Sequence, residues 1–321
     1  MSWHLFNWQF QLCSPLHVGY HKTMHLFRTR PYVPGRQIWA ALTAKLTLLF
    51  GLSNYQKVGS ALEEVFRFGY LYPSLEEGYP YIPCFTKDKG LTFGWGERCL
   101  TRREFEKKFL SSTASVAIDP QSFTVEEGML YQVEFVSPYL TTVRAGIEDY
   151  TPVYLKGLFW VCEAETSTFQ VTVEDRRITM KADQGLKEID FAEELAARLQ
   201  VGGERRNGFG LLKLKLLQLV KNVNERVARD VSGLPGDWHE DKASVYITLE
   251  EDEPVWGHVL EPAKVEAKGL IEPLVSRSWD SVKGAGQKIT SEGLAWAPGS
   301  LIEKKCTFEM LPHGLWKAGD P

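Results

Sequence analysis

Four glycines and two arginines fall within nine consecutive residues, in the segment Gly202-Gly203-Glu204-Arg205-Arg206-Asn207-Gly208-Phe209-Gly210. Glycine permits positive φ and lets the backbone approach a partner without a Cβ in the way. Arg205 and Arg206 carry guanidinium groups whose geometry matches phosphate oxygens. Phe209 could stack on a base or fill the core, and Asn207 could bond a base edge or simply tolerate a left-handed turn. From residue types alone, the segment predicts either a loop that holds single-stranded RNA or a structural turn.

A second concentration of basic residues lies near the N-terminus. From Met1 to Leu62 the chain has no Asp or Glu, and its Lys and Arg there are Lys22, Arg28, Arg30, Arg36, Lys45 and Lys57. The whole chain has a net charge of −4, so this segment carries +6 and the remainder −10. The total charge argues against a nucleic-acid binder, whereas a local basic face could attract a phosphate backbone. We expect Arg28, Arg30 and Arg36 to contact phosphates, with a solvated basic rim as the alternative.

The same segment contains four histidines, of which His17, His21 and His25 lie in its loop region after the first predicted strand. Histidine titrates near neutral pH, so one of them could act as general base or acid in a metal-independent RNA cleavage that deprotonates a 2′-hydroxyl. Histidines in a basic loop also contact phosphates and bases directly. We expect the second role for His21 and its neighbour Lys22, and we keep the catalytic role open.

Several other classes of site do not fit the sequence. There is no G-x-x-x-x-G-K-[ST] segment, and a dinucleotide-binding fingerprint would need a strand before its glycines and a helix after them. The five cysteines include no C-x-x-C pair, which argues against a zinc site and a disulfide framework. No bound cofactor or metal is expected. The chain has no apolar run of membrane-spanning length and starts with an alternating pattern, so we expect a cytoplasmic protein without a membrane partner.

The periodicity of apolar residues predicts the elements that must position these side chains. We expect a half-buried strand over residues 6–12 with one solvated face, a basic loop to residue 35, helices over 36–50, 55–68 and 101–110, and a hairpin of 115–118 with 130–136. Further strands are expected at 157–163 and 169–173, then a helix over 189–200 and a core strand over 211–220. The strand, helix, hairpin, helix and strand give the β-α-β-β-α-β order of an α+β, ferredoxin-like (RRM-like) fold with insertions.

The last hundred residues have a different character. A polar stretch, 222–242, is expected to link a domain of residues 1–220 to a smaller β-rich C-terminal part, 221–321. Lys283 and Lys288 flank Gly284 and Gly286 there, and they could form a second loop that faces RNA or a partner.

Four segments together resemble the motifs of the RAMP superfamily of CRISPR-associated proteins. The glycine segment resembles its G-G-x-R-R-x-G-F-G loop, and residues 14–19 resemble the turn after its first strand. Tyr32-Val33-Pro34-Gly35 resembles the entrance to its first helix, and residues 118–131 resemble its I-D hairpin. All four occur in family order over residues 5–220. The resemblance implies a subunit of a CRISPR ribonucleoprotein, most simply a type III effector complex, with crRNA and the other effector subunits as partners.

Three roles within the superfamily fit to different degrees. Backbone subunits that cleave the target carry an Asp in the loop that corresponds to residues 20–30, and no acid is present there. Processing endoribonucleases usually have their glycine loop close to the C-terminus, whereas 111 residues follow Gly210. We therefore expect a non-catalytic subunit that holds the repeat-derived 5′ tag of the crRNA and contacts neighbouring subunits. The alternatives are an endoribonuclease that uses His17, His21 or His25, and a non-cleaving backbone or scaffold subunit.

Overall fold

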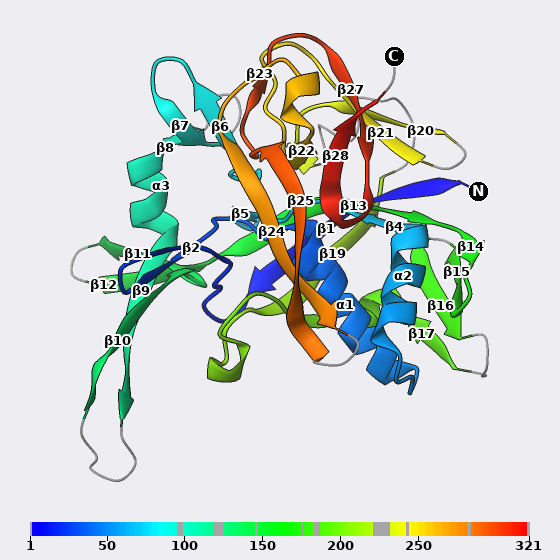
Figure 1. The fold of residues 1–321 in the computed structure, drawn as a ribbon, viewed down its shortest axis with the longest axis horizontal. Coiled ribbons are helices and arrows are strands. Elements are labelled where there is room, and N and C mark those ends of the chain that lie inside the picture. The colour runs from blue at the N-terminus through cyan, green and yellow to red at the C-terminus, as the bar shows by residue number, and fades with distance from the viewer. Residues whose placement is uncertain are drawn as a thin grey trace.

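The computed structural model describes residues 2–94, 99–118, 125–144, 147–174, 176–182, 187–220, 232–241, 244–280 and 284–319. Strands dominate this α+β fold, and the described residues include three α-helices, α1 (Gly35–Leu49), α2 (Tyr55–Val65) and α3 (Arg102–Phe109). None of the helices formed by the described residues has the length and apolarity needed to cross a membrane. Figure 1 shows a body of sheets and helices from which the β9–β10 hairpin projects.

A central antiparallel sheet joins the two ends of the predicted N-terminal domain. Its order is β18 (Arg198–Gln200), β19 (Leu211–Leu219), β1 (Trp3–Leu12), β13 (Tyr154–Cys162) and β4 (Phe66–Phe68), and β5 (Tyr72–Ser74) also pairs with β13. Phe6 lies opposite Phe159 on one side and opposite Leu219 on the other. The strands predicted at 6–12, 157–163 and 211–220 are confirmed. The last is not the core strand that we expected, because Leu212 is the one buried residue of β19.

Helices α1 and α2 cover one face of this sheet. Ile38, Leu42 and Leu46 of α1 are buried in the same core cluster as Phe6 and Trp8 of β1. Gly51 follows the helix with a φ of +69°, a conformation that favours glycine and ends the helix. The prediction of a helix at 36–50 is confirmed, whereas the helix predicted at 55–68 ends at Val65 and residues 66–68 form β4 instead.

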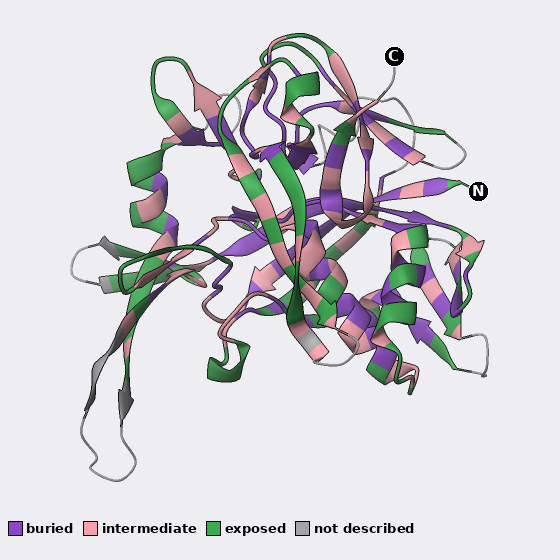
Figure 2. Cartoon of the chain, viewed as in Figure 1, coloured by how far each residue is buried: buried purple, intermediate pink, exposed green. Residues whose placement is uncertain are grey.

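The C-terminal part covers the second face of the sheet. Trp3, Leu5 and Trp160 share a buried cluster with Trp256 and Trp316. The prediction of a solvated face on the first strand is therefore wrong: Asn7 and Gln9 are each only 6% exposed. Figure 2 shows β1 and β13 buried along most of their length. The boundary near residue 220 stays a prediction. Residues 222–231 of the proposed linker lie outside the described residues, and the linker prediction is wrong at Asp237–Asp241, which is a strand.

One large sheet forms most of the C-terminal part. Its order is β20 (Asp237–Asp241), β21 (Ser244–Leu249), β27 (Cys306–Met310), β28 (Leu315–Ala318), β22 (His258–Leu260), β25 (Gly284–Trp296) and β24 (Ile271–Asp280). The same part of the chain also forms a separate two-stranded sheet, β23 (Ala267–Lys268) with β26 (Leu301–Ile302). It contains two 3-10 turns as well, at Pro262–Lys264 and Pro312–Gly314.

Smaller sheets lie around the centre. They are β2 (Gly19–Thr23), β3 (Leu26–Thr29), β10 (Val125–Val136) and β9 (Leu110–Ile118); β6 (Pro83–Thr86), β7 (Gly90–Phe93) and β8 (Leu100–Thr101); β11 (Tyr139–Arg144) with β12 (Ile147–Pro152); and β14 (Ala164–Glu165), β15 (Phe169–Glu174), β16 (Arg177–Ala182) and β17 (Glu188–Asp190). The predicted strand at 169–173 and helix at 101–110 are confirmed. The predicted hairpin forms, but it pairs with β3 and not with the central sheet.

Two local predictions are wrong. Residues 189–200 do not form a helix: Glu188–Asp190 is β17, Phe191–Leu195 is a π turn and Arg198–Gln200 is β18. Phe191 and Leu195 are buried on this single turn, and their spacing of four residues resembles that of a helix. The apolar pattern therefore predicted a helix where one turn joins two strands. The basic loop contains the β2–β3 hairpin, because pairing with β10 extends a sheet into this segment.

Candidate nucleic-acid interface

The glycine loop, residues 202–210, is fixed by hydrogen bonds to the segment that follows the first strand. The Gly203 N–H donates to the His17 carbonyl at 2.8 Å, and the Gly210 N–H donates to the Pro15 carbonyl at 2.7 Å. The Leu211 N–H donates to Ser14 Oγ at 2.9 Å. Two segments nearly 190 residues apart thus form one surface, and hydrogen bonds from backbone N–H groups of the loop and of Leu211 hold it together.

Two positions in this loop require glycine. Gly210 has a φ of +77°, and a Cβ there would lie 1.8 Å from the Val201 carbonyl oxygen. Gly202 has a φ of +84°, and its Cβ would lie 2.4 Å from the His17 carbonyl oxygen. Gly208 has a φ of +81° but faces open space. Gly202 and Gly210 therefore allow close backbone packing, whereas Gly208 only allows the left-handed conformation of the turn.

The polar side chains of the loop differ in what they contact. Arg205 and Arg206 are exposed on a single 3-10 turn. Asn207 donates from Nδ2 to Glu204 Oε2 at 2.7 Å, so its side chain is engaged within the loop. Phe209 is half-buried, and its ring meets Phe135 edge-on at 5.7 Å between centroids, which favours packing over base stacking.

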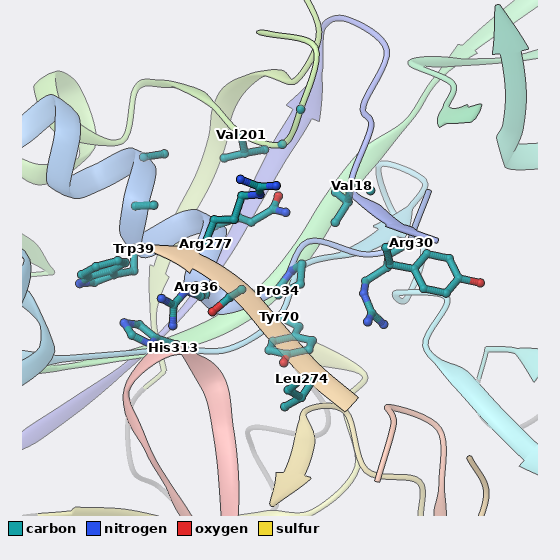
Figure 3. A pocket seen from close by; sticks show the side chains of 18 of the residues that line it. Val18, Arg30, Pro34, Arg36, Trp39, Tyr70, Val201, Leu274, Arg277 and His313 are labelled. Carbon is teal, nitrogen blue, oxygen red and sulfur yellow. The ribbon is translucent and has the colours of Figure 1, made fainter. Parts of the chain in front are cut away.

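A cleft of about 930 Å³ opens beside the loop. Most of its lining comes from three parts of the chain: residues 17–20 and 30–41 of the basic segment, residues 200–205 around the start of the glycine loop, and residues 274–277, 289 and 292 of the β24–β25 ribbon. Tyr70, His258, His313 and Leu315 complete it. Figure 3 shows Arg36 and His313 at one end of the cleft and Arg30 at the other. His17, Arg30, Arg36, Gly203 and Arg205 are the predicted site residues that the structure brings together here.

The remaining predicted residues lie outside the cleft lining. His21, Lys22 and His25 are exposed on the β2–β3 hairpin, where Lys22 Nζ lies 4.8 Å from the centre of the Phe27 ring. Arg206, Asn207, Gly208, Phe209 and Gly210 form the rest of the glycine loop and are absent from the cleft lining, and Arg28 lies beside β10.

His17 differs from the other two histidine candidates because it is buried against the cleft wall. Its Nδ1 contacts the Glu134 carbonyl oxygen at 2.7 Å, and a carbonyl can only accept, so the contact places a proton on Nδ1. The neutral ring then has its lone pair on Nε2. Among the described residues, no group of three His, Cys, Asp or Glu side chains could hold a metal ion.

The three arginines that we expected to bind phosphates each have a carboxylate partner. Arg28 Nε lies 3.0 Å from Glu134 Oε2, Arg30 Nη1 lies 2.6 Å from Glu272 Oε1, and Arg36 Nη1 lies 3.8 Å from Glu292 Oε1. At 3.8 Å the Arg36 pair is loose, so its guanidinium stays available at the start of α1, where helix amides also favour an anion.

Arg30 belongs to a buried network that links the N-terminal and C-terminal parts. It donates to Glu272 and, at 2.8 Å, to the Tyr32 hydroxyl, while His258 Nε2 lies 2.5 Å from the same Glu272 oxygen. Burial lowers the pKa of His258, so the ring is neutral and donates from Nε2 to Glu272. Its Nδ1 then accepts from the Tyr70 hydroxyl at 2.6 Å. Burial opposes ionisation of Glu272, but the hydrogen bond from His258 and the charge of Arg30 outweigh it and lower the pKa to about 2.

The cleft also contains side chains that the sequence did not single out. Arg277 on β24 lies in its lining and donates to the Gly286 carbonyl at 3.2 Å. Within the part of the chain that the structure describes, no carboxylate lies within 4.0 Å of Arg205 or Arg277. His313 lines the other end and bonds Glu63 at 2.9 Å. In the ribbon, the sequence pointed only to the loop between Lys283 and Lys288 as a possible RNA-facing or partner-facing element. Lys288 is exposed on β25, and Lys283 lies outside the described residues.

Comparison with known proteins gives one match that identifies a family. The model of the RAMP superfamily matches residues 9–213. No curated protein of similar sequence was found. Among solved structures, a chain of the Type III-B Cmr-beta complex bound to cognate target RNA and AMPPnP has 11% identity and a TM-score of 0.49, covering 92% of this chain and 85% of that one. Oligomeric Cmr4 from Pyrococcus furiosus has 13% identity and a TM-score of 0.29, covering 68% of this chain and 100% of that one. Because both TM-scores are below 0.5, the assignment of the chain to a family depends on the family model alone.

Proposed function

Because the chain belongs to the RAMP superfamily, we propose that it is a non-catalytic subunit of a type III CRISPR ribonucleoprotein that holds crRNA. In this proposal the repeat-derived 5′ tag of the crRNA lies in the cleft, and the outer surfaces contact neighbouring effector subunits. The family match supports membership of a CRISPR complex, and the residues that line the cleft support RNA binding.

The observation that carries the proposal is the joining of the glycine loop to the basic segment around one cleft. Arg205 of the glycine loop and Arg277 of the ribbon both line it, and α1 begins beside them with Arg36 in its first turn. Exposed backbone, arginines without close carboxylates and a helix N-terminus are the groups that hold a phosphate backbone. A site of this kind binds RNA through its phosphates and does not need a metal.

The strand order supports a ferredoxin-like fold for residues 1–220. Taken in chain order, β1, β4, β13 and β19 are the first, second, third and fourth strands, and their spatial order is fourth, first, third, second, with every pair antiparallel. A ferredoxin-like sheet has this arrangement, with the π turn at Phe191–Leu195 in the place of its second helix.

The proposal can be tested by purifying the chain with its partners. Co-expression with neighbouring CRISPR proteins and a repeat-spacer RNA should yield a complex in which a crRNA with its repeat-derived 5′ end resists mild nuclease. The double variant Arg205→Ala/Arg277→Ala should lose this protection. Lys304→Ala/Lys305→Ala removes the same charge from exposed ion pairs away from the cleft and should retain it. Equal protection in the two double variants would contradict the assignment of the cleft.

His17 supports a second candidate function, a metal-independent endoribonuclease. It is the one histidine of the three sequence candidates that lines the cleft, with its Nε2 lone pair available as a base. Incubation of the protein with repeat RNA in EDTA separates the functions. A specific cut that is lost in His17→Ala but kept in His21→Ala and His25→Ala would replace the non-catalytic assignment, whereas intact RNA supports it.

A further inference from the structure

The β24–β25 ribbon leaves the C-terminal sheet and has only two strands for most of its length. Among the strands that the structure describes, its one other neighbour is β22, which pairs with Trp296 and Ala295 at the base of the ribbon. Two-stranded ribbons are marginally stable in water by themselves, so contacts outside the sheet must hold this one in place. Figure 1 shows the ribbon crossing over the central sheet toward α1.

Three contacts attach the ribbon to the N-terminal part. At its base, Glu272 accepts a hydrogen bond from Arg30. Midway, Glu292 forms the loose ion pair with Arg36. Near its far end, the Trp279 ring stacks on Tyr55 at the start of α2, with 5.4 Å between ring centroids and 23° between their planes.

The cleft lies between the first and the last of these attachments. Leu274, Ser276 and Arg277 of β24 line it from the ribbon side, and residues 34–41 and 200–205 line it from the opposite side. The Ser276 and Thr290 hydroxyls are hydrogen-bonded to each other at 2.8 Å, which ties the two strands together over the cleft. A strand of RNA in the cleft is therefore covered by a bridge that is fixed at both ends.

We propose that the ribbon is a strap that restricts the cleft to single-stranded RNA entering by a free end. This rests on the proposed RNA-binding function and adds which RNA the cleft accepts. A double helix is too wide to pass beneath two strands that contact both sides of the cleft. An internal stretch of RNA enters only when the Trp279–Tyr55 contact opens.

The test fixes the strap and compares linear with circular RNA. Tyr55→Cys and Trp279→Cys, in a Cys99→Ser background that removes an exposed thiol, are joined by a short crosslinker that contains a cleavable disulfide. Binding of one single-stranded sequence, as a linear and as a circular molecule, is measured before crosslinking, after it and after reduction. Melting temperature confirms that each form is folded.

Crosslinking should change the affinity for linear RNA by less than about threefold. It should weaken the affinity for circular RNA at least tenfold, and reduction of the crosslinker should restore that affinity. Equal binding of both RNAs after crosslinking overturns the strap, as does loss of both. Absence of RNA binding before crosslinking instead rejects the proposed function itself, so the two failures are distinguishable.

A second variant keeps the strap testable without crosslinking. Trp279→Ala removes the far attachment and should speed dissociation of bound linear RNA at least fivefold. Leu294→Ala is the matched control, because this exposed ribbon side chain is absent from the cleft lining. Equal dissociation rates in the two variants would also overturn the proposal.

Discussion

At the residue scale, the two arginines of the glycine loop occupy different environments despite being neighbours. Arg205 lines the cleft and Arg206 does not. The sequence predicted both as phosphate ligands, since adjacent arginines in one loop cannot be distinguished without the direction of the turn. Arg28, Arg30 and Arg36 could not be assigned from sequence either, because their carboxylate partners lie more than 100 residues away.

Replacing each loop arginine by alanine should therefore have unequal effects on RNA binding. Arg205→Ala should weaken binding by about 2 kcal/mol, the scale of a hydrogen bond to a charged group. Arg206→Ala should cost less than a third of that. Fluorescence anisotropy at one fixed salt concentration measures both, and a larger loss for Arg206→Ala would reject the placement of the cleft.

Two glycines of the loop provide a matched pair for stability. Gly208→Ala introduces only the strain of a left-handed conformation, about 1–2 kcal/mol, because its Cβ meets nothing. Gly210→Ala adds a collision with the Val201 carbonyl and should lower the free energy of unfolding by clearly more. Denaturant titration compares the two variants, and equal losses would show that the loop is not packed as described.

At the element scale, the sequence predicts segments well where one apolar period continues over several turns. Helix 36–50 shows such a continuous pattern, and Gly51 marks its end. The helix predicted at 189–200 fails because Phe191 and Leu195 imitate a helical stripe within one π turn between two strands. The β2–β3 hairpin was missed because its pairing partner, β10, lies about 100 residues further along the chain.

The network that attaches the ribbon predicts a pH dependence of stability. The pKa of His258 is lowered in the folded protein, so below about pH 6.5 the unfolded chain takes up a proton that the folded chain does not. The free energy of unfolding should fall as the pH drops from 7.5 to 5.5. The Glu272 contribution remains over that range, because its folded pKa of about 2 and its usual value of 4.5 both lie below it.

His258→Gln should flatten this dependence, since glutamine does not titrate. Denaturant titrations at pH 7.5 and 5.5 measure it. His239→Gln is the control, because His239 is exposed on β20 and should leave the wild-type slope unchanged. If His258→Gln also leaves that slope unchanged, the network does not hold a neutral histidine.

At the scale of the whole molecule, the two faces of the central sheet have different partners, helices on one side and the C-terminal part on the other. Sequence patterns predicted the covered face at Phe6, Trp8 and Phe10 but not the burial of Asn7 and Gln9. No local pattern indicates that residues near 238, 256 and 316 return to cover the first strand. The packing of the C-terminal part on the central sheet also places Arg277 in the cleft lining. The ribbon side of the candidate site therefore could not be predicted from the sequence.

The salt dependence of RNA affinity tests the central claim most directly. Each phosphate that a cation neutralises on a single strand contributes about −0.7 to the slope of log affinity against log salt. Wild-type protein should show a steep negative slope, and Arg205→Ala/Arg277→Ala should reduce its magnitude by about 1.4. A flat response for the wild type, or the same slope in both proteins, would contradict an RNA-binding cleft formed by the glycine loop and the ribbon.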